Sequence, residues 1–219
     1  MVKKKPPHLQ KYVVFFILFF LLCGISFQAV LVSPLTIDIY QLYVRESVAE
    51  PYPLSMSSKT AKMHADKYVG YVTGDNEKLS AVFSEKEMQH AKDVRELYGA
   101  IKTTFFLITS TALLYVLLLR NNCSVSISKW LNKNKRSSKK SLVIIYVTIV
   151  TQLFFFKPLF YFLHRVFFTN DLWLLPYTSV TIQTFPQSFF IYFFILAILI
   201  NTLLYCFITQ IAPGVGQRQ

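Results

Sequence analysis

The sequence predicts an all-α membrane protein with four transmembrane helices, on the basis of its composition and of four long apolar runs. Of the 219 residues, 53% are apolar and only 16% are charged, and the mean hydropathy is positive, at +0.42. About 20 consecutive apolar residues cross roughly 30 Å of hydrocarbon as a helix. Runs of this length predict spans at residues 12–32, 101–119, 142–163 and 189–211 of a single membrane domain, 1–219.

The net charge of +12 does not indicate a nucleic-acid-binding protein, because a basic domain of that kind spreads Lys and Arg over a polar surface. The excess of Lys and Arg over Asp and Glu lies before the first span, between the second and third spans, and after the fourth. Twelve basic residues and no acid occupy these segments, whereas the remaining 11 basic and 11 acidic residues cancel. Because cytoplasmic loops are enriched in Lys and Arg, both termini are predicted to be cytoplasmic.

Residues 33–100, between the first two spans, are predicted to form an extracytoplasmic segment of helices. Ser33 and Pro34 suit the N-cap and first turn of a short helix that runs towards Glu46. The segment is short for an independent core and shows no strong strand alternation. We therefore expect these helices to lie over the outer face of the bilayer.

Two more helices are predicted in this segment. Ser57 or Ser58 can cap a helix over residues 59–68, which a turn containing Gly70 then ends. Ser84 and Glu87 form a capping-box pattern at the start of the third helix. No proline occurs from there to residue 120, so this helix is predicted to continue without a break into the second span.

Residues 164–188 form the second outer segment, which is predicted to be an aromatic loop in the membrane interface. It is rich in Phe, Trp, Tyr and Leu and is interrupted by Pro176 and Pro186. Aromatic rings of this kind lie between lipid headgroups and acyl chains. Little of this loop is expected to be in water.

Two outer histidines are the candidates for chemistry. On a helix, Asp93 lies three residues after His90 and on the same face, where a carboxylate can accept the imidazole N–H and fix its tautomer. His164 ends an apolar span at the interface, and ionisable groups at membrane depth indicate function. A solvated helix face at His90 and a histidine that reaches to lipid headgroups at His164 are the structural alternatives. Lys157 could extend to the headgroups, which is the favoured interpretation, lose its charge, or bind a phosphate or carbonyl oxygen.

Several other chemistries lack their sequence patterns. There is no G-x-S-x-G elbow, no H-E-x-x-H and no Gly-rich phosphate loop. His64 could join His90 and His164 in a metal site, although nothing in the spacing demands a metal. Transport is disfavoured because the predicted spans are mostly aliphatic and Phe residues.

The two histidine motifs resemble those of the bacterial lipoprotein intramolecular transacylase family. The resemblance covers nearly the whole chain, with four spans, a long first outer segment and a short aromatic second one. Its motifs are His90-Ala91-Lys92-Asp93-Val94-Arg95 and His164-Arg165-Val166-Phe167-Phe168, the latter continuing through Asn170, Trp173-Leu174-Leu175-Pro176 and Phe185-Pro186.

This resemblance implies an acyltransferase in the bacterial cytoplasmic membrane, with its active site facing the outer leaflet. It would move the sn-2 acyl chain of a diacylglyceryl lipoprotein from glycerol to the α-amine of the N-terminal Cys, giving the N-acyl, S-monoacylglyceryl lyso form. Donor and acceptor belong to one substrate, so positioning contributes much of the rate, and we expect no cofactor and no metal. The expected partners are the lipoprotein and membrane lipids.

The resemblance also assigns roles to residues of this chain. His90 and His164 become the catalytic pair, and we expect His90, backed by Asp93, to be the general base and His164 the acid or oxyanion stabiliser, or the reverse. Lys102, Arg165 or Lys157 would supply positive charge to the oxyanion, and Asn170 and Trp173 would shape the pocket. The competing hypotheses are a non-enzymatic membrane module that binds a lipid or a partner protein, and a metal-dependent hydrolase using His64, His90 and His164.

Overall fold

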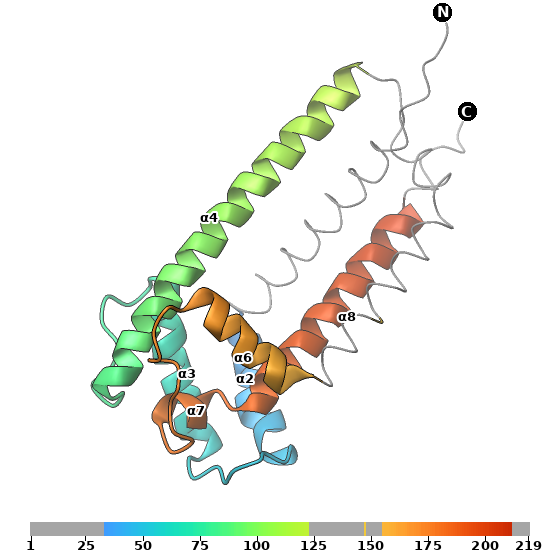
Figure 1. Ribbon diagram of the computed structural model, residues 1–219. Coiled ribbons are helices and arrows are strands. Elements are labelled where there is room, and N and C mark those ends of the chain that lie inside the picture. The colour runs from blue at the N-terminus through green and yellow to red at the C-terminus, as the bar shows by residue number, and fades with distance from the viewer. Residues whose placement is uncertain (1–32, 123–146, 148–154, 212–219) are drawn as a thin grey trace, which may run out of the picture. The chain divides into compact units, whose positions relative to one another are not determined.

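The computed structural model describes residues 33–122, residue 147 and residues 155–211. The first predicted span lies outside the described residues, as does most of the third. Every element in the described part of the chain is helical, which confirms the all-α prediction. The elements are α2 (Pro34–Ile39), η1 (Tyr40–Val44), η2 (Arg45–Ser47), α3 (Ser58–Thr73), α4 (Glu85–Asn122), α6 (Phe156–Phe167), α7 (Val180–Thr184) and α8 (Gln187–Ile211), as Figure 1 shows.

The chain divides into two compact units. One consists of residues 29–104 and 151–196 and contains both candidate histidines; we call it the site unit. The other consists of residues 1–28, 105–150 and 197–219. In this second unit, large apolar side chains on α4 and α8 are exposed, among them Phe106, Leu107, Ile108, Leu114, Leu199 and Leu203.

The predicted spans at 101–119 and 189–211 fall within α4 and α8. In the part of the chain that the structure describes, none of the helices combines the length and the hydropathy of a membrane-crossing helix. The count of four spans therefore stays a prediction.

The first helical stretch of the site unit begins where the sequence predicts. Pro34 occupies the first turn of α2, and the carbonyl of Ser33 accepts the amide of Thr36 at 3.0 Å. The side chain of Ser33 makes no cap bond, so proline geometry and this backbone bond start the helix. The stretch continues through η1 and η2 to Ser47, one residue beyond the predicted end.

Helix α3 is longer than the sequence predicts. Ser57 caps it, accepting the amide of Thr60 at 3.3 Å, but the helix passes Gly70 and ends at Gly74, whose φ of 95° is left-handed. Gly74 is therefore the C-terminal glycine that the turn requires. At Gly70 an added Cβ would lie 2.4 Å from Asn76 Nδ2, so a larger residue there would require the Asn76 side chain to move.

Helix α4 confirms the capping box and the unbroken helix. Ser84 donates its amide to Glu87 Oε2 at 2.9 Å and its hydroxyl to the same oxygen at 2.7 Å. The helix runs for 38 residues and passes through Gly99, at which no atom lies within 4 Å of an added Cβ. About 57 Å of helix results, at 1.5 Å per residue.

Helix α6 begins at Phe156, inside the region that the sequence predicts as the third span, and ends at Phe167. Pro158 lies in its first turn, where a missing N–H costs nothing. His164 is consequently in the last turn of a 12-residue helix rather than in the loop that follows a span. The predicted aromatic loop also contains a short helix, α7, which Ser179 caps by accepting the amide of Ile182 at 3.3 Å.

The core of the site unit joins its elements through aromatic rings. Tyr40 packs edge-to-face on Phe189 at 5.0 Å between ring centroids, and Tyr68 packs on Phe185 at 5.2 Å. Aromatic pairs in this geometry add to the stabilisation that burial alone provides. The buried members of this core are Ile37, Tyr40, Ala65, Tyr68, Phe83, Ala91, Phe185 and Phe189.

Candidate active site

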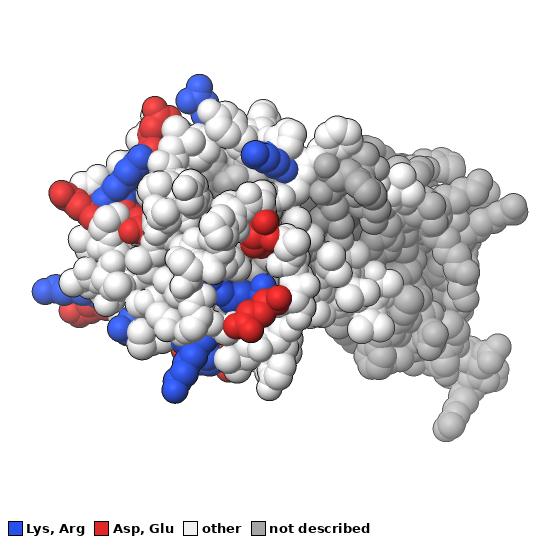
Figure 2. Space-filling view, turned by 90° about the horizontal axis from the view of Figure 1, so that it is seen from below, with Lys and Arg blue, Asp and Glu red and all other residues white. Residues whose placement is uncertain are grey.

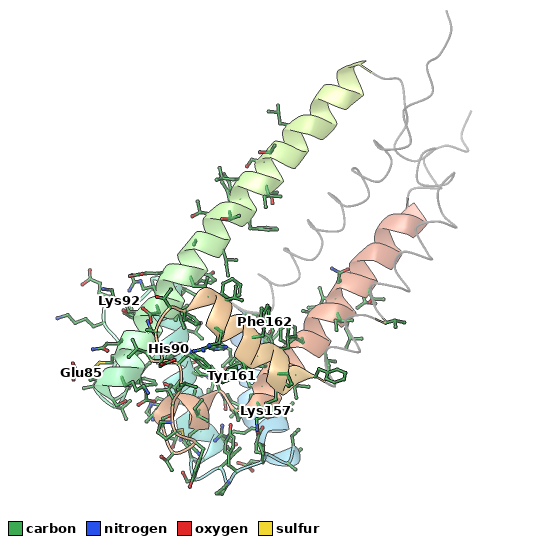
Figure 3. All side chains as sticks on the ribbon, viewed as in Figure 1. Glu85, His90, Lys92, Lys157, Tyr161 and Phe162 are labelled. Atoms are coloured by element: carbon green, nitrogen blue, oxygen red, sulfur yellow. The ribbon has the colours of Figure 1, made fainter. Side chains whose placement is uncertain are left out.

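The two candidate histidines face each other within the site unit. His90 lies in the second turn of α4 and His164 in the last turn of α6, and their ring centroids are 6.2 Å apart. In Figure 3 the His90 side chain lies between these two helices. The sequence singled out both residues, and the structure brings them together although 73 residues separate them along the chain.

The tautomer of His164 is defined by a backbone contact. Its Nδ1 lies 2.8 Å from the carbonyl oxygen of Phe160, one turn earlier in α6. A carbonyl only accepts hydrogen bonds, so Nδ1 carries the proton and, in the neutral ring, Nε2 carries the lone pair. Burial lowers the pKa of His164, and the bond to Phe160 partly opposes this decrease.

Aromatic rings surround His164 on several sides. Its ring centroid lies 4.0 Å from that of Phe160, 5.1 Å from that of Trp173 and 5.5 Å from that of Phe168. Tyr161 packs edge-to-face on Trp173 at 4.9 Å, so α6 and the following loop form one aromatic wall. Such a wall limits water around the imidazole and fixes its orientation.

His90 is more deeply buried, with only 7% of its surface exposed. Its Nδ1 is buried and has no hydrogen-bond partner among the described residues, while Phe168 packs edge-to-face on the ring at 5.2 Å. Burial and the neighbouring His164 lower the pKa of His90 to about 4, and Asp93 opposes the decrease. The ring is therefore neutral at pH 7.

Asp93 does not make the bond that the helix spacing predicts. Its Oδ2 accepts a hydrogen bond from Asn170 Nδ2 at 2.9 Å, and the Asn170 Oδ1 accepts the amide of Leu172 at 3.0 Å. Asp93 acts on His90 through its charge, and it also holds the loop after α6. Asp93 thus binds Asn170, 77 residues away in the sequence, instead of His90 on its own helix.

Glu87 links α4 to α7, and the sequence predicts only one of its two contacts, the capping box with Ser84. Its Oε2 completes the capping box, while its Oε1 accepts the amide of Thr181, at the start of α7, at 2.7 Å. The side chain is only 3% exposed. Burial alone would raise the pKa of Glu87, but the bonds from Thr181 and Ser84 lower it overall.

The three basic candidates differ from the histidines in exposure. Lys102 and Lys157 are exposed. Arg165 forms an ion pair with Asp171 at 3.6 Å, and its side chain is 63% exposed. None of the three is buried beside the imidazoles, which weakens the expectation that they hold an oxyanion.

The two pocket candidates, Asn170 and Trp173, both lie in the loop between α6 and α7. Asn170 binds Asp93, and the ring of Trp173 contacts that of His164. Trp173 is buried, and its indole Nε1 has no hydrogen-bond partner among the described residues. Lys86 donates to the carbonyl of Leu174 at 2.8 Å and so links the same loop to α4.

The third candidate histidine, His64, lies on a different helix from the other two. His64 is buried on α3, where its ring contacts Phe83 at 5.9 Å between centroids. Within residues 33–122 and 155–211, no group of three or more His, Cys, Asp or Glu side chains is arranged to hold a metal ion.

Comparison with known proteins gives the family. A family model described as lipoprotein intramolecular transacylase Lit matches residues 11–190. The structure of the membrane integral lipoprotein intramolecular transacylase Lit from Bacillus cereus is 18% identical, covers 92% of this chain and 95% of its own, and has a TM-score of 0.58. A comparison with curated proteins found no match.

These findings define the class as an all-helical transacylase family whose solved relative is a membrane protein. Because the family model matches well over half of the sequence, the chain belongs to the lipoprotein intramolecular transacylase Lit family. The family model confirms the family that the motifs around His90 and His164 indicate, and the fold agrees with that of the Bacillus cereus structure.

Proposed function

We propose that this protein transfers an acyl chain within a diacylglyceryl lipoprotein. The α-amine nitrogen of the N-terminal Cys attacks the sn-2 ester carbonyl, the new amide C–N bond forms, and the bond to the glycerol oxygen breaks. The amine loses one proton and the glycerol oxygen gains one, so the product is an N-acyl, S-monoacylglyceryl lipoprotein. The observation that carries this proposal is the facing pair of neutral imidazoles, His90 and His164, in a member of this family.

His164 is the better general base of the two. Its bond to Phe160 leaves the Nε2 lone pair available, so Nε2 accepts the amine proton and then returns it to the departing glycerol oxygen. This assignment reverses the order that the sequence motif favours, in which Asp93 backs His90. The reversal rests on the partners actually present, because Asp93 binds Asn170 and the carbonyl of Phe160 binds His164.

His90 is then the oxyanion partner. With a pKa lowered to about 4, its ring stays neutral at neutral pH and is poorly suited to accept and hold a proton. Because Nδ1 is buried and unpartnered among the described residues, we assign the proton to Nε2, from which an N–H can donate to the carbonyl oxygen as negative charge develops. A neutral imidazole can stabilise an oxyanion in this way.

The charge distribution supports a site on the outer side of the bacterial cytoplasmic membrane. The basic excess lies in the predicted cytoplasmic segments, whereas the rest of the chain, outer segments and spans together, sums to zero. Figure 2 shows acidic and basic side chains interspersed on the face of the described part that it displays, without a large patch of one sign. Both termini would be cytoplasmic, and the apolar walls around His164 suit an acyl chain that enters from the lipid.

The test is mass spectrometry of a lipoprotein N-terminus from a strain that makes only diacyl lipoproteins and expresses this protein. We expect N-acyl, S-monoacylglyceryl Cys, and an unchanged diacylglyceryl Cys with a free amine would overturn the proposal. His90→Ala and His164→Ala should each abolish the product while the protein still inserts into the membrane. If either variant keeps near-normal activity, the two histidines do not act as a catalytic pair. As a separate control for the metal-dependent alternative, EDTA should leave the wild-type rate unchanged.

A further inference from the structure

The ring of Phe168 packs on both imidazoles of the histidine pair. It lies edge-to-face on the ring of His90, with 5.2 Å between ring centroids, and its centroid is 5.5 Å from that of His164. The rings of Phe160 and Trp173, by comparison, contact that of His164. Phe168 is thus the part of the aromatic wall that covers the two histidines together.

The end of α6 fixes the position of this ring. Phe168 is the C-cap residue of the helix, with an extended backbone at φ −118° and ψ 129°. Its amide donates to the carbonyl of His164 at 2.9 Å. The backbone bond therefore ties Phe168 to the same residue whose imidazole its ring covers, and the two side chains keep their relative positions.

Phe168 shields the histidine pair from its surroundings. His90 is only 7% exposed and Phe168 is itself half-buried, so the phenyl ring stands between the imidazoles and the outside of the site unit. Burial is the largest cause of the lowered pKa of both His90 and His164, which agrees with little water at the two rings.

Water is the nucleophile that competes with the substrate amine at such a site. A general base at His164 Nε2 activates whichever nucleophile lies against it. If water lay there, its oxygen would attack the sn-2 carbonyl, a C–O bond would form, and the bond to the glycerol oxygen would break. Water would lose one proton to His164, and the glycerol oxygen would gain one. The products would be a free fatty acid and an S-monoacylglyceryl lipoprotein with a free amine.

The amine reaches the base by a route that water does not have. Donor and acceptor belong to one substrate, so the amine arrives together with the ester, whereas water has to enter from outside. An apolar ring over the base therefore slows hydrolysis without slowing transfer. Exclusion of water from an enclosed site prevents side reactions of this kind.

We propose that Phe168 determines the specificity of the reaction, because it keeps water from His90 and His164 and so directs the acyl chain to the amine. This inference rests on the proposed function, since it assigns the residue that separates transfer from hydrolysis at the same site. The role depends on apolar bulk, which a leucine at position 168 largely retains and an alanine does not.

The experiment measures the ratio of hydrolysis to transfer in Phe168→Ala and Phe168→Leu. The substrate is a diacylglyceryl lipopeptide in heavy-oxygen water, and mass spectrometry quantifies the N-acyl lipopeptide and the labelled fatty acid from the same reaction. Phe167→Ala is the matched control, because Phe167 is the same residue type at the adjacent position and is 50% exposed. The wild type should release little labelled acid.

We expect Phe168→Ala to raise this ratio about tenfold or more, because the space left beside two imidazoles offers polar partners to water. Phe168→Leu and Phe167→Ala should stay within about twofold of the wild-type ratio, because the apolar cover is kept. The ratio does not depend on the amount of folded protein, and Phe168→Val replaces Phe168→Ala if the latter gives no product. A lower rate with an unchanged ratio would overturn the proposal, since Phe168 would then contribute only to packing.

A measurement without turnover separates this proposal from the acyl-transfer proposal. Deuterium exchange at the imidazole C2 position, read by mass spectrometry across pH, gives the pKa of each histidine. In Phe168→Ala we expect the pKa of His90 to rise from about 4 toward the ordinary value of about 6.5, because water then reaches its ring. The pKa of His64, which burial on α3 also lowers, is the internal control for folding and should not change.

The two proposals then fail in different ways. If the pKa of His90 rises in Phe168→Ala but the wild type transfers no acyl chain, the exclusion of water stands and the reaction assignment fails. If the wild type transfers the acyl chain but the pKa of His90 and the product ratio are the same in Phe168→Ala, the role of Phe168 fails and the reaction assignment stands.

Discussion

The side chain of Asn170 donates a hydrogen bond to Asp93 across 2.9 Å and joins the loop after α6 to the helix that carries His90. The same Asn170 accepts the amide of Leu172, so it holds its own loop in shape at the same time. Trp173 follows directly in this loop and packs on His164. The contact between Asn170 and Asp93 therefore positions both imidazoles relative to each other.

Asn170→Ala is expected to lower kcat about tenfold through loss of a bond to a charged group, with a smaller change in KM. The control is the exchange Asp93→Asn with Asn170→Asp, which re-forms a donor–acceptor pair and should recover part of kcat. Turnover of a diacylglyceryl lipopeptide gives kcat for Asn170→Ala and for the double exchange. An Asn170→Ala enzyme with wild-type kcat would show that the bond does not position the pair.

The unfolding free energy should fall as the pH is lowered from about 6.5 to about 4, by up to about 3 kcal/mol from His90. Its folded pKa lies below the unfolded value of about 6.5, so the unfolded chain binds the extra proton in this range and the loss grows with acidity. Buried His64 and partly buried His164 add smaller losses of the same sign. Thermal unfolding in detergent should show a weaker pH dependence in His90→Phe than in the wild type. An unchanged dependence would contradict the pKa assignment.

The activity has its own pH dependence. Because both imidazoles have pKa values below the ordinary one, they are already neutral at pH 7. The rise of kcat/KM above pH 7 should then follow the substrate α-amine, whose pKa is about 8. A substrate with a less basic amine should move this limb to lower pH, and a limb that stays in place would assign it to the enzyme.

Glu87→Ala is expected to destabilise the protein by about 2–4 kcal/mol, because it leaves the amide of Thr181 and the cap at Ser84 without their acceptor. Glu87→Gln keeps one carbonyl oxygen and should lose about half as much. Glu85→Ala, two residues earlier in the same turn and exposed, is the control and should be nearly neutral. Chemical denaturation in detergent compares the three, and equal stability of Glu87→Ala and Glu85→Ala would contradict the shared-cap interpretation.

The exposed basic residues should matter little to the chemistry. Lys102→Ala, Lys157→Ala and Arg165→Ala are each expected to change kcat less than about threefold, because an exposed charge is screened by water. Arg165→Ala removes only a surface ion pair with Asp171. A loss of about a hundredfold or more in any one of them would instead mark it as the oxyanion partner.

Local sequence signals account for the predicted helix starts. The capping box at Ser84 and the proline at position 34 each act within one helical turn, so both can be recognised from the sequence alone. The sequence places the end of α3 too early, because a helix tolerates Gly70 and continues to Thr73. The start of α6 at Phe156 lies within the predicted third span, most of which is outside the described residues. The apolar runs that predict the second and fourth spans fall within α4 and α8. The number of spans stays a prediction.

The site can be predicted only in part from the sequence, because several contacts that define it join residues far apart along the chain. The sequence singles out His90 by its helical spacing from Asp93 and His164 by its place at the end of an apolar span, and the motifs of both are typical of the family. The partners that define them are distant in sequence, such as Asn170 for Asp93 and Thr181 for Glu87. The bond from His164 to Phe160 is local, but an i−4 carbonyl is present on every helix and so carries no sequence signature.

The shared carboxylate of Glu87 has an evolutionary consequence. One oxygen serves Ser84 at the start of α4 and the other the backbone amide of Thr181 at the start of α7, so position 84 depends on position 87, whereas position 181 contributes only its main chain. A change at position 87 is then tolerated only in a background where both helices have found other acceptors. Among homologous sequences we expect positions 84 and 87 to covary, and we expect a single substitution at position 87 that is harmless in one relative to be harmful in another.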